Sequence, residues 1–187
     1  MTVLDRIGMN STATIFQGDR VESFRGSVAS YFDSPPTGAR PPFLVIVMPG
    51  VLPEMRPPLV QHVERELNRL WLLPLHWDGR RAAQITFTAA QGAVKTLAAL
   101  VTPESPPPQF FPLPDGGVQV EWLIAGNSIE IEVEADGAIQ VLAMNTAGDV
   151  VTEGELGQAE SAGVMTVTRR FLGELTGIWR SGAPRAV

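Results

Sequence analysis

Histidine and carboxylate side chains occur at metal-ligand spacings in two places in this 187-residue chain. His62 and Glu66 are four residues apart on a segment with helical periodicity, so the imidazole and the carboxylate share one helix face. His76-Trp77-Asp78 has the His-x-Asp form of a non-haem iron site, because alternate side chains of an extended segment point the same way. Each pair supplies only part of a metal-ligand set.

The rest of either ligand set is missing, because the chain has no third histidine. At His62 and Glu66 we therefore expect a solvated helix face with a weak charge pair. At the second place we expect a turn that Asp78 caps with its own side chain while Gly79 adopts a positive φ. We predict no metal site and no cofactor.

Four glutamates on expected strands are the best candidates for acid–base chemistry: Glu121, Glu130, Glu132 and Glu134. Two opposed carboxylates repel each other, and this repulsion raises the pKa of one member. Catalysis would also require a cleft, whereas the polar face of a sheet is open, so we expect separate solvated carboxylates. Among the large aromatic residues, Trp77 is the one we expect to be available for recognition, because it lies in a turn.

Sequence motifs of the large enzyme classes are absent. The chain contains no phosphate-binding P-loop, dinucleotide glycine pattern, nucleophile elbow or zinc-protease helix. It also has no cysteine, which excludes disulfides, thiolate metal sites and cysteine nucleophiles and favours a reducing compartment. We assign no catalytic residue.

The distribution of charge is uneven. Between Thr96 and Thr168 there are 11 acidic residues and no lysine or arginine, so the rest of the chain carries a net positive charge. A region without cations cannot neutralise phosphates, which argues against binding to nucleic acid or to an anionic membrane. Its natural partner is a basic protein; alternatively, the region faces the basic remainder of the same chain or simply keeps the protein soluble.

Neither the first residues nor the apolar runs resemble a targeting or membrane-spanning segment. Met1 to Asn10 includes Asp5 and Arg6, unlike a secretory signal. The longest apolar run, Phe43 to Pro49, is far shorter than the roughly 20 residues that a membrane-spanning helix requires. We predict a cytoplasmic protein without a membrane span.

The elements that must position these residues follow from hydrophobic periodicity. Apolar spacing of three and four predicts helices in several segments, whereas a continuous apolar run predicts a buried central strand. Six prolines predict a stiff connector without regular structure. The helices are expected over Val21 to Phe32, Pro57 to Trp71, from a capping box at Thr88 to Gln91 onward, and Gln158 to Arg180; the strand is Phe43 to Met48 and the connector Pro103 to Pro114.

Between Gly117 and Asn145 the apolar residues alternate in three segments. Turns are expected at Gly126-Asn127 and Asp136-Gly137, which predicts a three-stranded antiparallel meander with one apolar and one wet face. The fold class is therefore α+β, an antiparallel β-meander packed against two or three helices. Residues 43–187 are expected to form a single domain, and residues 1–42 an arm or a part of it.

Two stretches resemble a group of short bacterial proteins of unknown function. The first is Leu75-His76-Trp77-Asp78-Gly79, and the second is Pro112 to Trp122, which contains Pro-Asp-Gly-Gly and Glu-Trp. The group has a Trp-Asp-Gly turn, a helix, a Pro-Asp-Gly-Gly turn, a Glu-Trp strand and a hairpin in that order, which matches Leu75 to Asn145. No active site is carried over, and Arg80 and Arg81 stand where the group has an aromatic and a small residue.

The function expected from these features is non-enzymatic binding of a basic protein partner, as in an antitoxin-like, immunity-like or assembly component. The residues expected to contact the partner are Trp77, Asp78, Glu130, Glu132 and Glu134. One alternative is a small metal-dependent or carboxylate-based hydrolase that uses Glu121, Asp78 and His76. Another is a structural subunit that forms a homo-oligomer through an edge strand or through the strand Phe43 to Met48.

Overall fold

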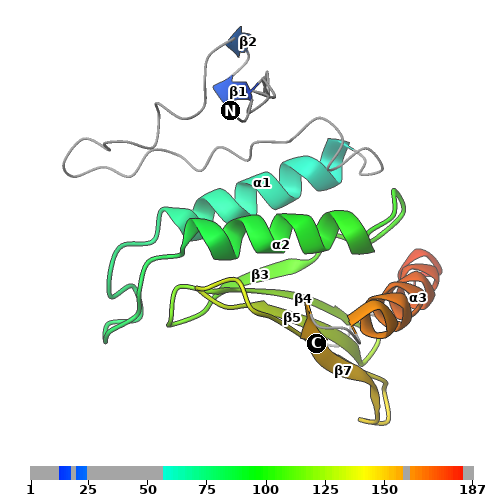
Figure 1. Cartoon of the computed structure of the whole chain (residues 1–187). Coiled ribbons are helices and arrows are strands. Elements are labelled where there is room, and N and C mark those ends of the chain that lie inside the picture. Colours follow the sequence, from blue (N-terminus) through cyan, green and yellow to red (C-terminus); the bar gives the residue numbers. More distant parts are fainter. Residues whose placement is uncertain (1–12, 18–19, 25–56, 158–160, 183–187) are drawn as a thin grey trace, which may run out of the picture.

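The computed structural model describes residues 13–17, 20–24, 57–157 and 161–182. The main body has three helices and a five-stranded sheet (Figure 1), which confirms the predicted α+β class. The helices are α1 (Pro57–Trp71), α2 (Phe87–Leu100) and α3 (Ser161–Arg180), and the strands are β3 (Gln109–Pro112), β4 (Val118–Ile124), β5 (Asn127–Val133), β6 (Ile139–Met144) and β7 (Val150–Leu156). No helix in these ranges is long and apolar enough to cross a membrane.

The sheet is an antiparallel meander in which every strand pairs with the next one along the chain, in the order β3-β4-β5-β6-β7. Alternate side chains of β4, β5 and β6 point to one face, here called the inner face, and are buried there. They include Val120, Trp122, Ile131 and Val141. Helix α1 packs beside β3, α2 over β4 and β5, and α3 mainly over β7, so the core lies between helices and inner face (Figure 1).

Helices α1 and α3 follow the predicted apolar stripes. Leu59, Val63, Leu67 and Leu70 of α1 are buried, as helical spacing of three and four requires. Helix α2 begins two residues earlier than the capping-box prediction. Its N-cap is Thr86, whose hydroxyl accepts the Ala89 amide hydrogen, so the prediction of a cap at Thr88 is wrong.

The prediction that Pro103 to Pro114 has no regular structure is wrong for β3. This strand is at the edge of the sheet, where proline is tolerated because one side of the strand needs no ladder hydrogen bonds. The Leu113 amide donates to the Gly117 carbonyl, so by alternation the backbone groups of Gln109 and Phe111 also face β4. The backbone nitrogen of Pro112 faces the free edge of the sheet, where no N–H is needed. The prolines therefore fit an edge strand.

The meander is also larger than predicted, because β3 and β7 join the three expected strands. The turn between β4 and β5 consists of Ala125 and Gly126, both with positive φ, and Asn127 is already the first residue of β5. The predicted turn at Gly126-Asn127 is thus wrong by one residue. Asn127 contributes its side-chain amide instead, which donates to the Ile124 carbonyl.

Near the N-terminus, β1 (Ala13–Gln17) and β2 (Arg20–Phe24) form a separate antiparallel hairpin. The helix predicted over Val21 to Phe32 is therefore wrong at residues 21–24, because this segment pairs with β1 in extended conformation. The rest of that helix, the predicted strand Phe43 to Met48 and the expected boundary at residue 42 lie outside the described residues.

Candidate functional site

The sheet face opposite the helices, here called the outer face, carries the glutamates that the sequence singled out. Cross-strand pairing places Glu121 opposite Glu130, while Glu132 lies one pleat further along β5. Glu153 of β7 lies on the same face, opposite Leu142 of β6. None of the three described helices packs on these side chains, so the outer face is an acidic surface formed by adjacent strands.

Glu121 and Glu130 are the closest carboxylate neighbours in this surface, since they face each other across the β4–β5 ladder. Partial burial raises the pKa of Glu121, and the negative charge of Glu130 raises it further. Among the described residues, no ion pair involves Glu121 or Glu130, so no cation there offsets this repulsion. One pair of carboxylates is therefore directly opposed and partly buried, where separate solvated carboxylates were expected.

Apolar side chains accompany the carboxylates on the outer face. Leu123 is 46% exposed and Phe111 is 39% exposed, although both are large hydrophobic residues. Leu142 and Met144 are half-buried on the neighbouring strand. Together with the glutamates these residues give the outer face a mixed apolar and acidic composition.

A groove of about 300 Å³ opens where β3 ends beside β4. Its walls come from the Pro106 to Pro108 segment, the end of β4, His62 of α1 and Trp179 of α3. Glu121 borders the groove, so the acidic surface continues into it. The proline wall is fixed at two carbonyls: Trp122 Nε1 donates to Pro106 O at 2.9 Å, and His62 Nε2 lies 2.6 Å from Pro108 O.

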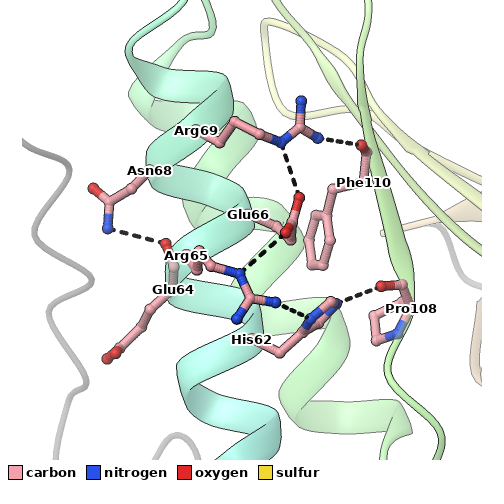
Figure 2. A network of polar contacts seen from close by, with 8 residues as sticks. All are labelled: His62, Glu64, Arg65, Glu66, Asn68, Arg69, Pro108 and Phe110. Atoms are coloured by element: carbon pink, nitrogen blue, oxygen red, sulfur yellow. Dashed lines mark hydrogen bonds and ion pairs between the residues drawn. The ribbon is translucent and has the colours of Figure 1, made fainter.

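His62 belongs to a network of hydrogen bonds and ion pairs that joins α1 to the edge of the sheet (Figure 2). Arg65 Nη2 lies 2.9 Å from His62 Nδ1, so Nδ1 accepts and Nε2 donates, which is the pattern of a neutral imidazole. Partial burial opposes ionisation of Glu66, but hydrogen bonds from Arg69 and Arg65 lower the pKa of this carboxyl group. The expected solvated face is thus an ordered polar network.

The same network covers the free edge of β3. Arg69 Nη2 donates to Phe110 O at 2.9 Å, and His62 approaches the Pro108 carbonyl two residues earlier (Figure 2). Both carbonyls point away from β4, because alternate residues of an edge strand face outward. Residues 62 and 69 are two helical turns apart, so one face of α1 satisfies both carbonyls. This arrangement blocks pairing of β3 with another strand.

Trp77 and Asp78 hold the loop between α1 and α2. Asp78 Oδ1 accepts the backbone N–H groups of Arg80 at 2.8 Å and Ala82 at 3.1 Å, and Gly79 has φ 73°. This confirms the turn predicted in place of an iron site. Hydrogen bonding to the Arg80 amide is the main reason why the pKa of Asp78 is lowered. The Trp77 indole donates to Ala83 O, so both side chains have a structural task.

The two turns in the resemblance to bacterial proteins contact each other. Ala83 N donates to Pro114 O and Thr86 N donates to Gly116 O, so the chain after the Trp-Asp-Gly turn docks on the Pro-Asp-Gly-Gly turn. Asp115 accepts amide hydrogens from Gly117 and Ala135, which ties this turn to the β5–β6 connection. The spacing of the two motifs is thus explained by packing at one end of the sheet.

The structure unites some of the sequence candidates and separates others. Glu121, Glu130 and Glu132 share the outer face, and Glu134 follows directly after the end of β5. His76 and Asp78 belong to the α1–α2 loop, whereas Glu121 lies in the middle of β4 beside Gln109 and Glu130. Within the described ranges, no three histidine or acidic side chains gather as a metal-ligand group.

The groove and its most exposed aromatic residue, Trp179, were not predicted from the sequence. A sequence signal existed, because Trp179 follows Ile178 and so falls outside the predicted apolar stripe of α3. An aromatic residue off the stripe of an amphipathic helix is expected at the surface. Comparisons with protein-family models, with curated proteins and with solved structures give no match to this chain.

Proposed function

We propose that this protein is a non-enzymatic binding module that engages a basic protein partner through the outer face of its sheet. The observation that carries the proposal is the direct pairing of Glu121 with Glu130 on a face that no described helix covers. Opposed like charges destabilise a sheet, so a partner that brings cations to this face would gain binding energy from relieving the repulsion.

Charge complementarity supports a basic partner over other classes. No lysine or arginine occurs between Thr96 and Thr168, the stretch that includes all five strands of the main sheet. The strands of the sheet therefore contribute no cation to the outer face, where the acidic residues are Glu121, Glu130, Glu132 and Glu153. A nucleic acid or an anionic membrane would be repelled by such a surface, whereas a basic protein would be steered towards it.

Exposed apolar side chains favour a protein partner over small cations. Leu123 and Phe111 flank the carboxylates and remain more than a third exposed. Association with a protein would remove this apolar surface from water, which contributes about 25 cal/mol per Å². The combination of apolar contacts and peripheral charges matches the usual composition of protein interfaces.

The test is affinity purification from the native host with the native protein and with a Glu130→Gln/Glu132→Gln variant. We expect a basic protein to bind the native protein in a salt-sensitive manner and to be lost from the variant, because the variant removes two carboxylates from the face. The interaction is then reproduced with the purified pair, which separates a direct partner from lysate background.

The matched control is Glu174→Gln/Asp149→Asn, which changes the net charge by the same amount as the first variant. Its two substitutions lie away from the outer face, in α3 and in the β6–β7 turn. This control should retain the partner. Loss of the partner from both variants would show dependence on net charge alone and would overturn the proposed surface. Recovery of no basic protein by the native chain would overturn the proposed function.

A further inference from the structure

The groove beside β4 contains a backbone position where the sheet ladder is interrupted. Gln109 pairs with Glu121, so the residue that would pair with Leu123 is Pro107. Proline has no N–H to donate, and β3 begins only at Gln109, two residues later. Ile124 and Asn127 close the β4–β5 hairpin, so the backbone groups of Ile124 face β5. By alternation, the carbonyl and N–H of Leu123 face the opposite side of β4, towards Pro107.

Three residues that carry groups able to recognise a cation therefore line the groove. The Glu121 carboxylate supplies a negative charge, and the Leu123 carbonyl supplies a neutral acceptor. The Trp179 ring, 38% exposed, supplies an aromatic surface from α3. The proline wall is held by Trp122 and His62, so the groove is formed before any ligand enters.

We propose that this groove takes up an arginine side chain of the partner, with the guanidinium group stacked on Trp179 and donating hydrogen bonds to Glu121 and the Leu123 carbonyl. This inference rests on the proposed function, since it specifies how the basic partner is recognised. In this arrangement the groove holds the central, most strongly bound side chain of the interface. The rest of the acidic outer face surrounds it.

The chemistry of the groove favours arginine over lysine. A guanidinium group is planar, stacks on aromatic rings and has several N–H donors in a fixed arrangement, so it can serve a carboxylate and a carbonyl together. An ammonium group is a compact and strongly hydrated charge that stacks poorly. Glu121 also faces Glu130 across the ladder, so an incoming cation would relieve the repulsion between the two carboxylates. Burial first, and the charge of Glu130 second, raise the pKa of Glu121.

The experiment is an NMR titration of ¹⁵N-labelled protein with N-acetyl-arginine methylamide. N-acetyl-citrulline methylamide serves as the uncharged analogue of nearly the same shape, at equal ionic strength. We expect the arginine compound to shift the Trp179 indole N–H and the Leu123 amide signals in a saturable manner. The citrulline compound should bind at least about fivefold more weakly, because it lacks the charge.

Variants localise the effect. Glu121→Gln and Trp179→Leu should each weaken arginine binding about fivefold or more, whereas Glu132→Gln on the same face should change it less than about twofold. The spectra of the free variants report whether each one is folded. Equal binding of both compounds, or unchanged affinity in the Glu121 and Trp179 variants, would overturn the arginine site.

The outcomes separate this inference from the proposed function. Capture of a basic partner that depends on Glu130 and Glu132, without arginine-specific shifts at Trp179, would refute the groove and leave the acidic face as the binding surface. Arginine-specific shifts without any captured partner would refute the proposed function, and the groove would remain a site for free or peptide-borne arginine.

Discussion

Glu121 is a carboxylate whose ionised form is disfavoured by the fold. Burial and the charge of Glu130 raise the pKa of its carboxyl group above the ordinary value of 4.5. The folded protein therefore holds this proton to higher pH than the unfolded chain does, and ionisation costs stability as pH rises between the two pKa values. At neutral pH the full cost is present.

Replacement of Glu121 by glutamine should consequently stabilise the fold at neutral pH. We expect a gain of about 0.5 kcal/mol in the free energy of unfolding near pH 7, limited by solvent screening of a partly exposed group. The gain should disappear at about pH 3.5, where the carboxyl group is protonated in both states. Urea unfolding at the two pH values measures this, and a destabilised variant at neutral pH would contradict the prediction.

Asp78 shows the opposite linkage. Hydrogen bonds from the Arg80 and Ala82 amides lower the pKa of this carboxyl group, so its contribution to stability is present above the unfolded-state pKa and is lost as pH falls through the lower folded-state value. Asp78→Ala should accelerate hydrogen exchange at the Arg80 and Ala82 amides, because both lose their acceptor. Asp78→Asn keeps one acceptor oxygen and should slow exchange again, and equal exchange in both variants would argue against the capping role.

Among whole elements, α1 is attached to the sheet by polar contacts as well as by its apolar stripe. Arg69→Ala removes the donor to the outward-facing Phe110 carbonyl and the ion-pair partner of Glu66. We expect a loss of about 1 kcal/mol in the free energy of unfolding, measured by urea denaturation. Arg170→Ala, which removes only an exposed pair with Glu174, should cost less than about 0.5 kcal/mol; comparable losses would indicate that the edge contact contributes little.

Helix α2 approaches β5 closely at a glycine. A Cβ atom on Gly92 would lie 2.7 Å from Val133 Cγ1, which is closer than side-chain atoms approach. Gly92→Ala should therefore destabilise the native protein by about 1 kcal/mol, despite the better helix propensity of alanine. In a Val133→Ala background the clash is gone and the same substitution should stabilise. Thermal unfolding of the four proteins measures the coupling, and equal effects in both backgrounds would refute the contact.

Elements with continuous apolar periodicity were predictable from sequence, and those whose inner face is not apolar were not. The stripe from Leu59 to Leu70 placed α1 correctly. In contrast, β7 carries Thr152 and Gly154 on its inner face, because α3 packs so closely there that Gly154 abuts Val164. Because the residues at these positions are small or polar, β7 lacks the alternation of apolar and polar residues by which a strand is recognised in sequence.

The candidate site was likewise predictable from the sequence only in part. The acidic face was predictable, because alternation in β5 alone places Glu130 and Glu132 on one side. The groove was not predictable, because its walls come from His62, Pro107, Leu123 and Trp179, which are distant in sequence. A site assembled from four segments depends on packing that local patterns do not encode.

At the scale of the whole molecule, the separation of charges predicts a response to salt. The acidic stretch from Thr96 to Thr168 contains no cation, so its carboxylates repel one another across adjacent strands. Raising ionic strength from about 0.02 M to about 0.5 M should stabilise the native protein by up to about 1 kcal/mol through screening. Glu130→Gln/Glu132→Gln should show a smaller increase in chemical unfolding experiments, and an unchanged response would place the repulsion elsewhere.

The meander order also has a kinetic consequence. Strands that pair with their neighbours along the chain close only short loops, so the sheet has a low contact order and can assemble while the chain is still emerging from the ribosome. Trp179 lies close to the end of α3, the last described helix, and reaches the groove only after that helix has docked. The acidic strands can therefore form early, whereas the groove beside β4 is complete only once α3 has docked.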